Sequence, residues 1–178
     1  METLKVSRLF FYVGLVSAVV AVGYAAPVVL GPLVNPAGHN IINNGPGSIL
    51  TDYTTWPAMW MVVAFTMFAL AAVAGSFAWS FGYYLVARVF NRESTNGGLA
   101  LLNLLLFVVG VYLSTALMAY VGYDEGLKIA TGLSPLVVAG LAQWTVYPTG
   151  LGLGMALLGV LLGVLNLAVT ARTGKVVQ

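Results

Sequence analysis

The sequence contains no cysteine. This absence excludes disulfides, thiolate metal sites, cysteine nucleophiles and dithiol redox chemistry for this chain. Histidine is almost as scarce, since His39 is the only one. Metal sites normally need three or four protein ligands, and one histidine cannot supply both axial ligands of a transmembrane haem. We therefore expect no cofactor to be held by this chain alone. We interpret His39 as part of a solvated, asparagine-rich loop, with an oxygen-ligand cation site as the alternative.

Charged residues are also rare, at 7% of the 178 residues, whereas a typical soluble domain has about 25%. The few charges are separated by four long uncharged stretches, Leu9–Thr51, Tyr53–Ala87, Ser94–Tyr123 and Ile129–Ala171. A helix needs about 20 predominantly apolar residues to cross a bilayer. The composition therefore predicts an integral membrane protein. A net charge of +2 is too small to indicate nucleic-acid binding.

The apolar stretches, divided at their Gly-, Pro- and Asn-rich turns, predict an all-α membrane protein with one membrane domain over residues 1–178. We expect four spans, at about residues 8–30, 57–90, 99–120 and 149–171. The last uncharged stretch is too long for one crossing, and Pro148 lies within it. Because proline interrupts a helix, we expect a short interfacial or re-entrant helix at 134–147 before the fourth span. One long kinked helix is the alternative.

The charges are distributed unevenly over the predicted loops. With four spans, both termini and the turn at 91–98 lie on one side, together with Lys5, Arg8, Arg88, Arg92, Arg172 and Lys175. The other side has Lys128 as its one basic residue, beside Asp52, Asp124 and Glu125. Basic residues concentrate in cytoplasmic loops. We therefore expect an N-in, C-in multi-pass protein of the plasma membrane with cytoplasmic termini.

Glycine is abundant in the predicted fourth span. Gly150, Gly154, Gly159 and Gly163 follow one another at helical spacing. Small residues four apart let two helix backbones approach closely, so that van der Waals contact holds helices together in lipid. Ala71 and Gly75 in the second span are the expected partner face. Two interpretations stay open here. These positions bind another subunit, or they pack within the four-helix unit, which is the more economical reading.

Polar residues in and near the spans suggest a second kind of site. Gln143, Trp144 and Tyr147 lie together before the fourth span, and Arg88 and Arg92 lie at the inner headgroup level. One interpretation is that these residues contact a lipid or quinone headgroup. The plainer interpretation is that Gln143, like Asn103, Ser114, Thr115 and Asn166, forms hydrogen bonds between helices, and that the arginines set the topology.

The same scarcity of charge excludes several functions. Pumps and ion-coupled transporters carry ionisable residues inside the membrane, and we expect no Asp, Glu, His or Lys there. Intramembrane proteolysis lacks its paired carboxylates or HExxH motif. We therefore expect a non-catalytic accessory subunit of a larger complex, such as an energy-transducing (respiratory or electron-transfer) one. Its partners would be other integral membrane subunits and lipids. The alternative is a homo-oligomeric channel or carrier for an uncharged solute.

Overall fold

The computed structural model describes residues 2–34, 56–93 and 96–176, and this part of the chain is almost entirely helical. Its elements in chain order are α1 (Glu2–Val34), α2 (Trp56–Met67), the π-helix η2 (Phe68–Gly75), α3 (Ser76–Arg88), β1 (Arg92–Glu93), α4 (Gly97–Ala130), α5 (Pro135–Leu141), the 3₁₀-helix η3 (Gln143–Thr145), α6 (Val146–Thr173) and β2 (Lys175–Val176). Helices long and apolar enough to cross a membrane occupy Glu2–Ala25, Trp60–Arg88, Gly97–Gly126 and Gln143–Thr173. The prediction of an all-α, multi-pass membrane protein with four spans is confirmed.

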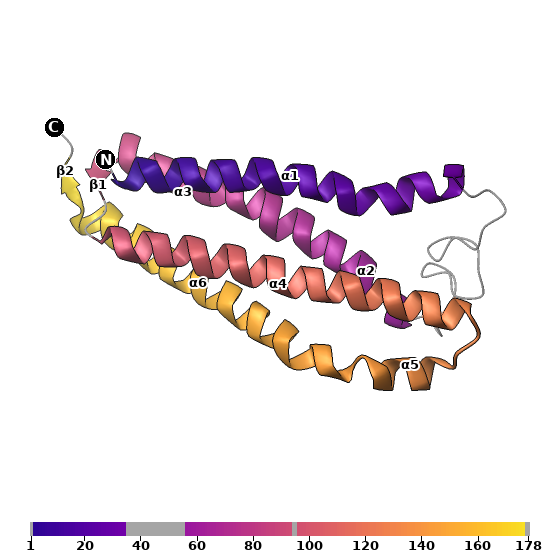
Figure 1. Cartoon of the computed structure of the whole chain (residues 1–178). Coiled ribbons are helices and arrows are strands. Elements are labelled where there is room, and N and C mark those ends of the chain that lie inside the picture. The colour runs from indigo at the N-terminus through magenta and orange to yellow at the C-terminus, as the bar shows by residue number, and fades with distance from the viewer. Residues whose placement is uncertain (1, 35–55, 94–95, 177–178) are drawn as a thin grey trace.

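The four long helical segments lie roughly side by side as an elongated bundle, and both termini are at the same end (Figure 1). Helix α4 packs against α6 along most of its length and against α2, while α1 packs against α3 and η2. Helix α5 lies at the opposite end from the termini, where the chain turns from α4 toward α6 (Figure 1).

The core is richest in aromatic side chains toward the end with the termini. Phe10 of α1 is fully buried, and its ring stacks on Tyr83 and Trp79 of α3 at centroid distances of 5.9 and 6.1 Å. Phe107 of α4 closes the cluster, 6.3 Å from Phe10. Three helices are thereby held together by four rings. Farther along, the buried Phe68 of η2 packs on Tyr24 and on Tyr112 of α4.

The turn at 91–98 has more structure than the sequence predicts. Asn91 has φ 49°, a left-handed conformation that Asn tolerates at the end of a helix. It leads into β1, which pairs antiparallel with β2 in the register Arg92↔Val176 and Glu93↔Lys175. The Arg92 Nη1 also donates a hydrogen bond to the Gly174 carbonyl at 2.8 Å. The second and fourth spans are thus tied together where both end.

The third span does not end near Tyr120, as the sequence suggests. Helix α4 continues through Gly122–Gly126 and ends at Ala130. Gly122 supports packing rather than a turn, because a Cβ atom here would lie 2.9 Å from Met61 Cα of α2. An ion pair between Asp124 and Lys128, one turn apart, also stabilises the helix there.

The region before the fourth span also differs in its boundaries. The break lies at 142–145, in the 3₁₀ turn, and Pro148 lies in the first turn of α6. Proline is tolerated there because the first N–H groups of a helix have no intrahelical partner. Helix α5 begins with Ser134 as its N-cap, whose Oγ accepts a hydrogen bond from Val137 N.

Candidate functional site

Two features of the structure are candidates for function: the glycines of α6 and a pocket beside Glu125. The inward glycines of α6 are in contact with α4. A Cβ atom at Gly159 would lie 2.6 Å from Phe107 N, and one at Gly163 would lie 2.5 Å from Asn103 Nδ2. On α4, a Cβ atom at Gly110 would lie 2.5 Å from the Gly152 carbonyl oxygen. The backbones of α4 and α6 therefore touch, and Gly110 belongs to a contact that the sequence analysis did not include.

Gly150 and Gly154 lie on the outward face of the same helix, and Gly150 also lines the pocket beside Glu125. Both are exposed, and a Cβ atom at either would meet nothing within 4 Å. Large apolar side chains continue this face along α6, with Leu151, Leu157, Leu158 and Leu161 all exposed. The four glycines named together by the sequence analysis therefore divide into an inward pair, Gly159 and Gly163, and an outward pair, Gly150 and Gly154.

Ala71 and Gly75 lie in η2, which packs mainly on α1 and α4. A Cβ atom at Gly75 would lie 3.0 Å from Phe107 Cζ of α4. The expected pairing of these two residues with the glycines of the fourth span is therefore replaced by contact through the Phe107 side chain, which lies between Gly75 and Gly159.

A buried polar network accompanies the inward glycines. Asn103 Nδ2 donates a hydrogen bond to the Gly159 carbonyl at 2.8 Å, Tyr83 OH donates to Asn103 Oδ1 at 3.2 Å, and Asn166 Nδ2 donates to Tyr83 OH at 3.4 Å. These bonds join α3, α4 and α6, which is the interhelical role that the sequence suggests for Asn103 and Asn166. Ser114 and Thr115 instead donate to carbonyls of their own helix, at 2.8 and 2.7 Å.

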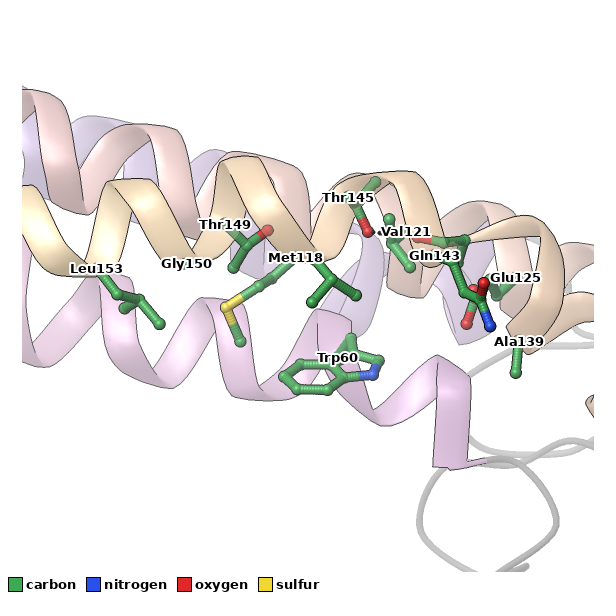
Figure 2. Close-up of a pocket in the computed structure, with 12 residues that line it drawn as sticks. Trp60, Met118, Val121, Glu125, Ala139, Gln143, Thr145, Thr149, Gly150 and Leu153 are labelled. Carbon is green, nitrogen blue, oxygen red and sulfur yellow. Dashed lines mark hydrogen bonds between the residues drawn. The ribbon is translucent and has the colours of Figure 1, made fainter.

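A pocket of about 330 Å³ lies near the end opposite the termini. Its lining comes from α2, α4, α5, η3 and the start of α6 (Figure 2). Most of the lining is apolar, including Trp60, Met118, Val121 and Leu153. Glu125, Gln143, Thr145 and Thr149 add polar groups to one side. The space has the size and the mixed character of small-molecule sites.

Glu125 is the residue of this pocket that sequence reasoning missed. The sequence places it in a loop after the third span, whereas the structure leaves only 4% of its surface exposed. Its Oε1 is buried and makes no hydrogen bond within the described structure. The signal that identifies it is its position four residues after Val121 and seven after Met118, which places all three on one face of α4.

The charges next to Glu125 on α4 are already paired with each other. Asp124 and Lys128 form an i,i+4 ion pair with partly exposed side chains. The hydrogen bond with Asp124 raises the pKa of Lys128 above its ordinary value, so this lysine keeps its charge. None of the described residues that line the pocket is a lysine or an arginine. Glu125 therefore lacks a counter-ion within the pocket lining.

The five proposed headgroup residues lie in different places. Gln143 lines the pocket. Trp144 and Tyr147 are 59% and 87% exposed, and Trp144 packs on Tyr120 of α4. Arg88 and Arg92 lie at the other end of the bundle, where α3 and β1 meet (Figure 1). The structure therefore does not join these five residues into one site.

The part of the chain that the structure describes contains no cluster of three or more His, Asp or Glu residues suited to a metal ion. His39, Asp52 and the asparagine-rich loop lie outside the described residues. No family model, curated protein or solved structure matches this chain. Functional inference therefore rests on the two glycine faces and on the pocket.

Proposed function

We propose that this protein is a non-catalytic subunit of a larger membrane assembly, and that the outward face of α6 binds a transmembrane helix of a different subunit. The observation that carries the proposal is the open space at Gly150 and Gly154. Glycines lower helix propensity by roughly 1 kcal/mol each. A pair spaced four apart on an outward face has a structural use when a second helix packs there.

The inward face of the same helix supports this reading. Gly159 and Gly163 let α4 and α6 approach until their backbones touch. Interhelical association in lipid depends on such close contact, because lipid tails are as apolar as leucine side chains. The outward pair has the same spacing, and exposed leucines surround it. A partner helix could therefore approach this face as closely as α4 approaches the inward face. The sequence also predicts that the assembly is an energy-transducing one, and this stays a prediction.

We also propose that the end with both termini faces the cytoplasm at the plasma membrane. Basic residues at this end support it, namely Lys5, Arg8, Arg88, Arg92, Arg172 and Lys175, as the positive-inside rule requires. The cysteine-free chain makes the test simple. In intact cells, an impermeant thiol reagent should modify Thr131→Cys and spare Thr173→Cys, since both residues are exposed and lie at opposite ends. Modification of Thr173→Cys with protection of Thr131→Cys would show that the termini face the outside.

The test of assembly is the native mass of the protein after gentle detergent extraction from its own membrane. We expect different integral subunits in fixed stoichiometry with this chain. An absorption spectrum of the same sample reports haem or pigment held by those subunits. A closed ring of identical copies would favour the channel or carrier. In that case, liposomes containing this chain alone should take up the solute. A monomer free of other proteins would contradict the proposal.

A matched pair of variants identifies the face that binds. Gly154→Leu fills the open space on α6 and should release the partner subunits. Gly23→Leu on α1 is the control, because Gly23 is also exposed with open space but has Val19 and Pro27, rather than glycines, four residues away. Equal release by both variants, or by neither, would contradict binding through the α6 face.

A further inference from the structure

We propose that the Glu125 pocket, which shares Gly150 with the outward face of α6, binds an organic ammonium ion, whose nitrogen pairs with the Glu125 carboxylate and whose apolar body fills the pocket. Two independent observations meet here. One is a cavity of about 330 Å³ among α2, α4, α5 and α6. The other is a carboxyl group that is almost fully buried, lines that cavity and has one oxygen without a hydrogen-bond partner.

The charge of the ligand follows from what surrounds the carboxyl group. Removing a carboxylate from water is unfavourable by several kcal/mol unless a counter-ion or hydrogen bonds offset it. The residues lining the pocket from α2, α5, η3 and α6 are uncharged. On α4, Lys128 is hydrogen-bonded to Asp124. A cation that enters the pocket therefore supplies the missing partner of Glu125.

The lining indicates an organic cation rather than a metal ion. Calcium takes six to eight oxygen ligands, and zinc takes three or four protein ligands, whereas Glu125 is the one acidic side chain among the described residues of the lining. Trp60, Met118 and Leu153 present apolar surface to the same space (Figure 2). An ammonium group with an apolar substituent satisfies both parts of this site. Gln143 and Thr149 lie on the polar side and are able to bind substituents of the nitrogen.

The ammonium group has two possible sources, a lipid headgroup or a free amine, and lipid composition distinguishes them. The probe is benzyltrimethylammonium, titrated into protein in nanodiscs made of phosphatidylglycerol, with calorimetric detection. The same titration is repeated after adding phosphatidylethanolamine. Weakened probe binding would identify the lipid headgroup as a competing ligand, whereas unchanged binding would identify a free amine.

The decisive comparison uses two glutamates at opposite ends of the bundle, Glu125 in α4 and Glu93 in β1. Glu125→Gln preserves shape and removes the charge, and we expect the probe to bind at least roughly tenfold more weakly. Glu93→Gln is the control, because Glu93 lies in β1 at the other end of the bundle and is not among the pocket residues, and the affinity of this variant should stay within about twofold of that of the native protein. The uncharged isostere neopentylbenzene should bind the native protein more weakly than the probe does.

A second variant keeps the test valid if Glu125→Gln folds poorly. Ala139→Trp fills the mouth of the pocket from α5, where Ala139 is exposed, and should weaken probe binding while Glu125 is retained. No binding of the cation to the native protein, equal binding by Glu125→Gln in a folded state, or equal binding of neopentylbenzene would each overturn the proposal.

Discussion

The inward and outward faces of α6 have the same glycine spacing and different surroundings. Each has a glycine pair spaced four apart, but the inward face also carries the buried polar residues Asn166 and Thr170. On the inward side, Gly159 and Gly163 meet the backbone and side chains of α4, and Asn103 hydrogen-bonds the Gly159 carbonyl. On the outward side, Gly150 and Gly154 meet nothing within 4 Å. The comparison teaches that glycine spacing marks a surface suited to helix packing and does not say which helix packs there.

The largest expected loss of stability comes from a substitution on the inward face of α6. Gly159→Leu places a side chain where a Cβ atom alone would lie 2.6 Å from Phe107 N. Because the obstacle is backbone, α4 and α6 must move apart, and we expect a loss of about 3 kcal/mol or more in the free energy of unfolding. Reversible unfolding in mixed micelles measures it.

The control is Gly154→Leu on the outward face, which should not lower the unfolding free energy of the isolated chain and, through the higher helix propensity of leucine, should raise it by up to about 1 kcal/mol. Equal destabilisation by the two variants would show that the faces are not distinct.

A smaller effect tests the polar side of the inward face. Asn103→Ala removes the bonds to the Gly159 carbonyl and to Tyr83 OH, and leaves both groups buried with fewer partners. We expect a loss of about 1–2 kcal/mol by the same unfolding measurement. Unchanged stability would mean that close backbone contact, without the network, holds α4 to α6.

Two neighbouring tyrosines on α3 test how much one hydroxyl group of this network contributes to stability. Tyr83→Phe removes one hydroxyl group that bonds Asn103 and Asn166, so we expect a loss of about 0.6 kcal/mol. Tyr84 is the matched neighbour, with a side chain 48% exposed, and Tyr84→Phe should leave the unfolding free energy unchanged. A larger loss for Tyr84→Phe would contradict the assignment of the network to the inward side.

The smallest effect has the opposite sign. Thr170 is on the inward face of α6, and its buried Oγ1 has no hydrogen-bond partner within the described residues. Thr170→Val should therefore be neutral or stabilise the protein by up to about 0.5 kcal/mol. Thr115→Val is the matched control, because the equally buried Thr115 donates to the Val111 carbonyl, and this variant should be less stable than the native protein. The reverse order would show that Thr170 makes an important polar contact.

Much of the architecture follows from the sequence alone. Long uncharged stretches are sufficient to predict membrane residence and four spans, because hydrophobic length is the dominant constraint in a bilayer. Boundaries were harder to predict where a residue type has two uses. Gly122 resembles a turn residue and is a packing residue, and Pro148 resembles a break and lies within the first turn of a helix.

The candidate sites were less predictable for a related reason. Hydropathy places Glu125 near a membrane boundary, but its burial depends on how α5 and α6 fold back over α4 (Figure 1). The division of glycines between faces likewise depends on the position of α4. The short strands β1 and β2 form because the segment after α3 meets the segment after α6, which no local pattern indicates. Tertiary contacts, rather than local propensity, decide all three features.

The measurement that tests the central claim most directly is photolabelling of the native chain with a lipid-soluble diazirine, with labelled residues located by mass spectrometry. It compares the outward face of α6, around Gly154 and Leu157, with the exposed Val16 and Val19 of α1. In intact membranes the α6 face should be protected and α1 labelled. After dissociation of the assembly in detergent, both should be labelled equally. Equal labelling of both faces in the intact membrane would contradict a partner helix on α6.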